Sequence, residues 1–117
     1  MYSWMCLLKE LEIGNYEIIL STAAGSCKKL LESLKVTQII LDECGMCSEP
    51  EALGPTMNKT ELKHLVLIGD HKQLRPIVTS RVAKAKQLNI SLFERLYKSK
   101  EKYCIMLDTQ YRMVSFS

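Results

Sequence analysis

Short apolar runs separated by longer mixed stretches occur along the whole chain of 117 residues. Four of these runs, at 16–20, 38–41, 65–68 and 103–107, have the length and the polar boundaries that predict strands. Strands that alternate with helices pair in parallel through crossover connections. The pattern therefore predicts an α/β fold with a parallel sheet.

Capping residues indicate where helices begin and end. Gly14 is placed to end a first helix, and Ser26 is placed to begin a second. The tetrads at 48–51 (Ser-Glu-Pro-Glu) and 91–94 (Ser-Leu-Phe-Glu) have the capping-box pattern and predict two more helix starts. The apolar faces of the first two helices are Trp4, Leu7, Leu8 and Leu11, and then Leu30, Leu31 and Leu34.

Composition narrows the class of protein. With 47% apolar and 25% charged residues, the chain is ordinary for a globular protein, and its length allows one domain at most. No apolar run approaches the roughly 20 residues that cross a bilayer, and the N-terminus lacks the features of a secretion signal. Five irregularly spaced cysteines indicate reduced thiols in an intracellular protein, cytoplasmic or nuclear. A net charge of +3 is compatible with nucleic acid but does not predict it.

Two acids, Asp42 and Glu43, follow the run at 38–41. The carboxyl ends of parallel strands are where α/β sheets bind ligands. Phosphoryl transfer uses one carboxylate to hold Mg²⁺, usually through its waters, and a second group to polarise the attacking water. A solvated strand end would explain the two acids equally well, if this feature stood alone.

The run at 65–68 leads into the string Gly-Asp-His-Lys-Gln-Leu-Arg-Pro at 69–76. Gly69 allows a tight exit from the strand, and Pro76 stiffens the far side of the loop. Gln73 can both donate and accept hydrogen bonds, so it can register a phosphate group. A solvated turn would explain each charge singly, but the ordered string is specific. His71 is expected to be a loop residue and not an isolated metal ligand.

The tetrad Gln-Tyr-Arg-Met at 110–113 follows the last predicted strand. An aromatic ring can stack on a purine, and a guanidinium can pair bidentately with phosphate oxygens. The structural alternative is a strand exit with a buried tyrosine, Tyr111, and a surface arginine, Arg112.

Together these motifs resemble those of superfamily 1 helicases of the Upf/Sen-like branch, and most closely the Upf-like and zinc-finger-associated members. The resemblance spans roughly residues 17 to 113. It implies part of a first RecA-like domain, with an incomplete parallel sheet of the P-loop NTPase type. It also implies ATP and Mg²⁺ as cofactors and single-stranded RNA or DNA as a partner, without a membrane.

The resemblance also implies roles for residues of the two strand-end motifs. Asp42 would hold the metal and Glu43 would activate water. Gln73 would sense the γ-phosphate, and Asp70 would be a buried organiser of the loop near the metal.

Four further residues receive roles from the same resemblance. Tyr111 would contact the nucleotide base, and Arg112 would contact the γ-phosphate. Ser21 and Thr22 would touch the nucleic-acid backbone, which binds without reading sequence. A Ser-Thr turn is also a common helix entry.

Two parts of a complete helicase are missing from these residues: the Gly-x-x-x-x-Gly-Lys-Ser/Thr loop that cradles phosphates, and the second RecA-like domain. Both ends therefore look cut, and we expect the chain to be a fragment of a larger helicase that is inactive alone. The alternatives are a short natural protein that kept only the scaffold, and a non-catalytic module that binds nucleic acid or protein. An exposed sheet edge would serve protein partners.

Cys44 and Cys47 form a Cys-x-x-Cys pair, which is the spacing of half a zinc site or of a redox pair. A structural zinc site needs four ligands, and the sequence has no second pair. We therefore favour small residues at a strand-to-helix turn over a metal or redox protein.

Overall fold

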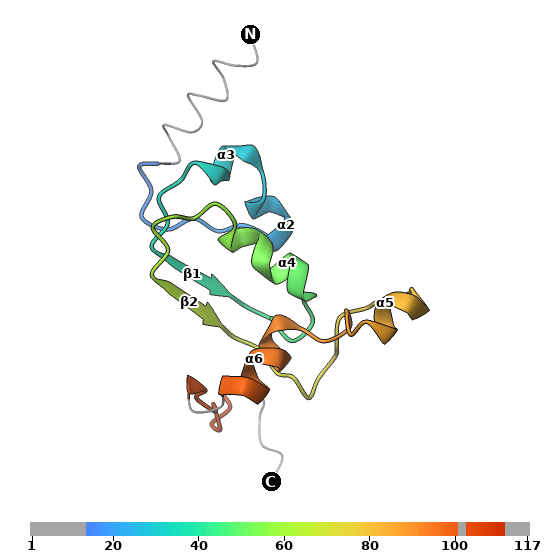
Figure 1. The fold of residues 1–117 in the computed structure, drawn as a ribbon. Helices are drawn as coiled ribbons and strands as arrows, with labels where there is room; N and C mark the ends of the chain where they lie inside the picture. Colours follow the sequence, from blue (N-terminus) through green and yellow to red (C-terminus); the bar gives the residue numbers. More distant parts are fainter. Residues whose placement is uncertain (1–13, 101–102, 112–117) are drawn as a thin grey trace.

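A computed structural model of the protein describes residues 14–100 and 103–111 (Figure 1). Its sheet contains two parallel strands, β1 (Gln38–Leu41) and β2 (His64–Leu67). The strands pair in simple register, with Ile39 opposite Leu65 and Leu41 opposite Leu67. The α/β class and the parallel pairing are thus confirmed, and β2 begins one residue earlier than the sequence predicted.

The crossover from β1 to β2 contains α4 (Glu49–Leu53) and the 3₁₀ turn η1 (Gly54–Thr56). The predicted capping box begins α4, because the backbone N–H and the hydroxyl of Ser48 both donate to Glu51 Oε2, at 2.9 and 2.7 Å. Figure 1 shows α4 lying alongside the two strands, next to the short helix α2 (Ala23–Ser26).

The predicted helix from Ser26 is wrong in its start and its length. Thr22, not Ser26, caps α2, since its Oγ1 accepts from the Gly25 N–H at 3.0 Å. A break at Cys27 then separates α2 from a second short helix, α3 (Lys29–Glu32). The alternative that the Ser-Thr turn is a helix entry is therefore confirmed for Thr22.

At the C-terminal end of the fold, α6 (Leu92–Lys100) begins where the second capping box predicted. Ser91 Oγ accepts from the Glu94 N–H at 3.0 Å, but the Glu94 carboxylate accepts hydrogen bonds from Arg75 and Lys98. Helix α5 (Arg81–Ala85) was not predicted, because five residues are too few to show a helical apolar pattern. The helix predicted before Gly14 lies outside the described residues.

Two predicted strands are absent from the described part of the chain. Residues 16–20 and 104–111 have no regular secondary structure, and Leu20 and Ile105 are 92% and 88% exposed. Strand preference reflects packing against a neighbouring strand more than the backbone itself. Neither segment joins the β1–β2 ladder here, so their apolar residues alone do not make them strands.

No residue of β1 or β2 is buried, and most of the buried residues lie instead after β1, in the α4–η1 crossover and around the start of α6. Cys44 follows β1, Ala52 lies in α4 and Leu92 begins α6, and each is at most 3% exposed. On the sheet itself, Ile40 and Val66 are 63% and 46% exposed. The packing thus supports the loops that follow the strands. No described helix is long and apolar enough to cross a membrane.

Candidate active site

Two loops lie side by side at the carboxyl end of the sheet. The acid loop (residues 42–47) follows β1, and the glutamine loop (residues 69–76) follows β2. Ile68 N–H donates to Leu41 O at 2.8 Å, and Cys44 N–H donates to Ile68 O at 2.9 Å. The parallel pairing therefore continues past the strands and fixes the start of one loop against the start of the other.

Glycines allow the two loops to approach this closely. A Cβ at Gly45 would lie 2.5 Å from the Asp70 carbonyl oxygen, and one at Gly69 would lie 2.8 Å from Gly45 N. No described glycine has a positive φ. These two positions thus require glycine for space and not for an unusual backbone angle. Gly45, inside the Cys-x-x-Cys pair, was the overlooked signal of this contact.

The acid loop presents both carboxylates to solvent at the end of β1. Asp42 Oδ1 accepts a hydrogen bond from the Glu43 N–H at 2.9 Å. Glu43 has a φ of 55°, in the left-handed region, which costs a non-glycine residue about 1–2 kcal/mol. Asn58 and Gln87, both in turns, also have a positive φ, so this backbone angle alone assigns no role to Glu43.

Asp70 accepts two hydrogen bonds within the glutamine loop, and it is exposed and not buried, contrary to what the resemblance implied. Its Oδ1 accepts from the Lys72 N–H at 2.8 Å, and its Oδ2 accepts from Gln73 Nε2 at 3.0 Å. The Lys72 hydrogen bond first, and then that of Gln73, hold the pKa of Asp70 below its ordinary value. Because both partners belong to the same short loop, the carboxylate needs no burial to find them.

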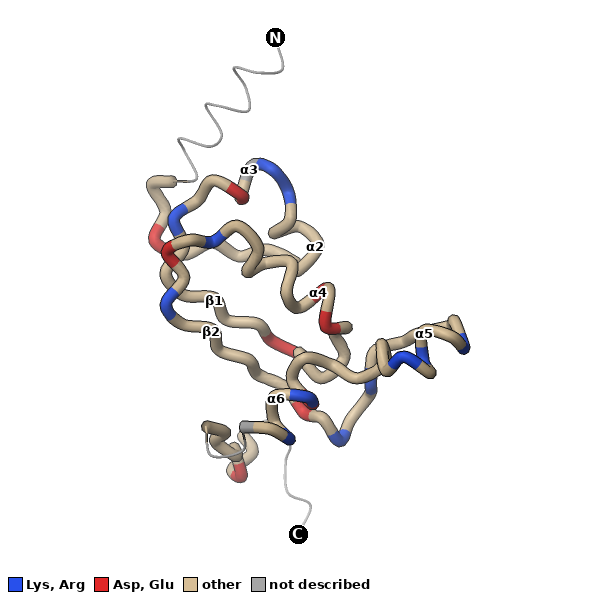
Figure 2. Tube along the Cα trace, in the orientation of Figure 1, with Lys and Arg blue, Asp and Glu red and all other residues tan. Residues whose placement is uncertain are grey.

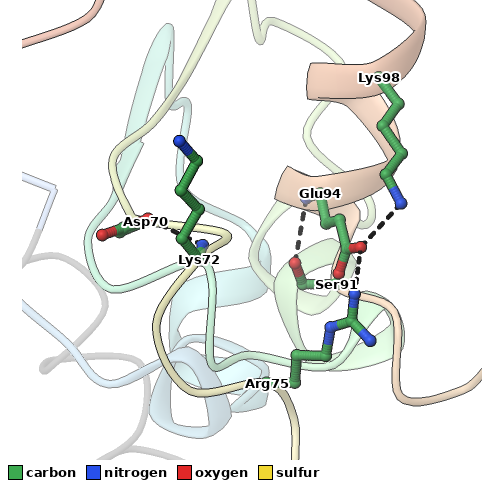
Figure 3. A network of polar contacts seen from close by, with 6 residues as sticks. All are labelled: Asp70, Lys72, Arg75, Ser91, Glu94 and Lys98. Carbon is green, nitrogen blue, oxygen red and sulfur yellow. Dashed lines mark hydrogen bonds and ion pairs between the residues drawn. The ribbon is translucent and has the colours of Figure 1, made fainter.

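The glutamine loop also contacts α6, which the sequence did not indicate. His71 stacks on Tyr97 with ring centroids 4.3 Å apart. Arg75 Nη2 donates to Glu94 Oε1 at 2.8 Å (Figure 3). The only sequence signal at Glu94 was its place in a capping box. His71 lies in a loop, as predicted, and its ring has an aromatic partner.

The other predicted site residues lie on other segments. Thr22 and Ser21 are exposed at the start of α2, and Ser21 Oγ donates to Thr22 O at 3.0 Å. Tyr111 is 93% exposed, so the alternative of a buried tyrosine is wrong. Arg112 lies outside the described residues.

The cysteine pair is built into the turn of the acid loop. Cys44 is buried and its Sγ donates to Leu41 O at 2.9 Å, while Cys47 Sγ lies 3.8 Å from Glu51 Oε2. Burial raises the pKa of both thiols, and the charge of Glu51 adds to the rise at Cys47. Protonated thiols are poor nucleophiles and poor metal ligands.

No cluster of three or more histidine, cysteine or acidic side chains is placed for a metal among the residues that the structure describes. This finding does not conflict with a magnesium role for the acid loop. Mg²⁺ keeps several of its waters and typically takes one or two carboxylates together with substrate phosphates.

Comparison with known proteins identifies the family. A family model described as an AAA domain matches residues 7–81, more than half of the chain. The 3'-5' exoribonuclease HELZ2 of Mus musculus is 45% identical over 104 residues, which are 87% of this chain and 3% of that protein. The regulator of nonsense transcripts 1 homolog of Neurospora crassa is 37% identical over 101 residues, which are 86% of this chain and 9% of that protein.

A third relative is the ATP-dependent helicase NAM7 of Saccharomyces cerevisiae, 39% identical over 105 residues, which are 89% of this chain and 10% of that protein. The chain belongs to the AAA-domain family, and the resemblance to Upf- and Sen-like helicases of superfamily 1 is confirmed. It spans a tenth or less of the length of these three relatives.

Proposed function

We propose that this chain supplies the magnesium-binding and water-activating acids, together with the γ-phosphate sensor, of an ATP-dependent helicase. The observation that carries the proposal is the close backbone contact of the two loops at the sheet's carboxyl end, which places the acid loop, with Asp42 and Glu43, beside the loop that contains the Asp70–Gln73 pair. Ligands of parallel α/β sheets bind at this edge. The chain would form part of a first RecA-like domain.

Each of the three central side chains has one role in this proposal. Asp42 holds Mg²⁺ through the ion's waters, and Glu43 polarises the water that attacks the γ-phosphate. Gln73 presents its amide to the γ-phosphate while Asp70 Oδ2 accepts from the amide nitrogen at 3.0 Å. That hydrogen bond leaves the Gln73 amide oxygen and one N–H to report on the ligand.

For the nucleic-acid partner we propose contacts to the backbone of single-stranded RNA or DNA. The hydroxyls of Ser21 and Thr22 are both exposed. That of Thr22 accepts from the Gly25 N–H and keeps its own hydrogen for a phosphate, whereas that of Ser21 would exchange its bond to Thr22 O for one to a phosphate. Basic side chains also gather on and just after α5, at Arg81, Lys84 and Lys86 (Figure 2), and such a group attracts phosphates without reading sequence.

For the nucleotide pocket we propose that Tyr111 stacks on the base and Arg112 pairs with the γ-phosphate. The exposed ring of Tyr111 is free of packing that would prevent such stacking.

The test is a titration of the isotopically labelled chain with Mg²⁺ and ATP, followed through the backbone amide resonances of Asp42, Asp70 and Gln73. We expect all three to shift when Mg²⁺ and ATP are present together, with weak affinity because the chain has no phosphate-cradling loop. Asp42→Asn should remove the part of these shifts that depends on Mg²⁺. Asp108→Asn is the matched control, since Asp108 is an exposed acid on another segment.

Shifts that persist unchanged in Asp42→Asn would remove the metal role from that residue. Resonances that respond to an RNA oligonucleotide but never to Mg²⁺ with ATP would instead support the non-catalytic binding module.

A further inference from the structure

Helix α6 contacts the glutamine loop on both sides of Gln73. On one side the ring of His71 stacks on Tyr97, with centroids 4.3 Å apart and ring planes at 26°. On the other side Arg75 donates to Glu94 at 2.8 Å. Glu94 and Tyr97 are three residues apart, so they project from the same face of the helix. One helix face therefore holds the loop two residues before and two residues after the glutamine.

The carboxylate of Glu94 is buried and is held by groups of its own helix, whereas its partner Arg75 is partly exposed. The Glu94 side chain is 3% exposed, whereas that of Arg75 is 54% exposed. A buried carboxylate is stable only where donors surround it. Lys98 Nζ donates to the same oxygen at 2.8 Å, and Ser91 Oγ accepts from the Glu94 N–H (Figure 3). Arg75 must come to this fixed carboxylate, which ties that end of the loop to α6.

The same helix is tied to the element that follows the acid loop. Arg95 Nε and Nη2 donate to the two carboxylate oxygens of Glu49, at 2.8 and 2.6 Å. Glu49 is the first residue of α4, which begins two residues after the acid loop ends. Such a bidentate pair fixes orientation as well as distance. Helix α6 thus contacts the glutamine loop directly and is joined to the helix that follows the acid loop.

We propose that α6 is the support that fixes Gln73 in its place in the glutamine loop, with Glu94 and Tyr97 as its positioning residues. The proposal rests on the function proposed above for Gln73. Neither residue touches the nucleotide; both act on the sensor through His71 and Arg75. Loss of either contact leaves the loop held at one end only, so Gln73 loses its fixed place.

The experiment uses the whole labelled chain without nucleotide and measures the side-chain amide resonances of Gln73 and the hydrogen exchange of the Lys72 N–H, which bonds Asp70. Tyr97→Leu and Glu94→Gln should each broaden or shift the Gln73 signals and speed the Lys72 exchange roughly tenfold. Tyr97→Phe keeps the aromatic face and should behave as the wild type.

Ser99→Ala is the matched control, because Ser99 is an exposed residue of the same helix whose hydroxyl donates to Leu96 O and not to the glutamine loop. It should leave the Gln73 signals unchanged. Unchanged Gln73 signals in a folded Tyr97→Leu chain would overturn the proposal, as would equal effects of Tyr97→Phe and Tyr97→Leu. If Glu94→Gln does not fold, Arg75→Gln tests the same contact from the exposed side.

A second experiment adds Mg²⁺ and ATP to the wild-type chain and to Tyr97→Leu. It distinguishes a failure of this inference from a failure of the proposed function. If Gln73 does not respond to the nucleotide, its sensor role fails, while the variants measured without nucleotide still decide whether α6 positions the loop. If Gln73 responds equally in wild type and in Tyr97→Leu, the positioning role fails and the sensor role stands.

Discussion

Single residues of the candidate site differ in how visible they were in the sequence. Asp42 and Gln73 could be proposed as site residues because each belongs to a motif of fixed residue order after a predicted strand. Such a motif can be recognised without knowing the fold. Tyr97 was not found, because its partner His71 lies 26 positions earlier in the chain and meets it only in the folded structure. The left-handed backbone of Glu43 was equally hidden, since glutamate gives no sequence signal for a positive φ.

The positive φ of Glu43 predicts that the chain is more stable with glycine than with alanine at this position. Glycine adopts a φ of 55° without a steric penalty, so Glu43→Gly should unfold with a free energy about 1 kcal/mol higher than Glu43→Ala, which keeps the strain. Chemical denaturation of the two variants measures the difference. Equal stabilities would mean that the residue at 43 changes its backbone angle when the side chain is shortened.

The close approach of the two loops at Gly45 predicts that a larger residue at this position destabilises the chain. Gly45→Ala places a methyl group 2.5 Å from the backbone oxygen of Asp70, and separating the loops should cost about 1–3 kcal/mol of stability. The control is Gly54→Ala, whose methyl group would meet only the flexible Sγ of Cys27. Denaturation midpoints compare the two, and a loss in Gly45→Ala no larger than in Gly54→Ala would show that separating the loops costs no more than moving one cysteine side chain.

At the scale of elements, a prediction was confirmed where the residues that hydrogen-bond the element could be recognised from the sequence pattern. Ser48 and Glu51 hydrogen-bond each other in the capping box of α4, and β1 and β2 hydrogen-bond each other in the sheet. The positions of these elements could therefore be predicted. The runs at 16–20 and 103–107 have similar composition but no ladder partner among the described residues. Pairing is a property of two segments, which one run of apolar residues does not specify.

The ion pairs that fix α6 predict a loss of stability in acid. The hydrogen bond from Lys98, with the charge of Arg75, holds the pKa of Glu94 below its ordinary 4.5. A lowered pKa in the folded chain means that the stabilisation is complete above that ordinary value and is lost as pH falls through the lowered one. Denaturation at a series of pH values should therefore show stability falling below about pH 4.5, with a shallower fall in Glu94→Gln. An identical pH profile for both chains would contradict the role of this pair.

At the scale of the whole molecule, the described fold is open. Its radius of gyration is 17.4 Å, whereas a compact domain of this length would have about 13 Å. Apolar side chains on the sheet and on the segments beside it are largely exposed, including Ile18 at 79% and Ile40 at 63%. A two-stranded sheet also leaves the outer edges of both strands unpaired in the described residues, and unpaired edges promote association.

This openness predicts that the isolated chain is marginally stable and self-associates. Few residues are buried, so the free energy of unfolding should lie at or below the lower end of the usual range of about 5–15 kcal/mol. Light scattering at increasing concentration should show growing particles, and Ile40→Lys should reduce that growth because a charge on the exposed sheet face opposes stacking and edge pairing. A chain that stays monomeric and unfolds cooperatively well inside that range would show that the β1–β2 pair and its loops suffice as an independent domain.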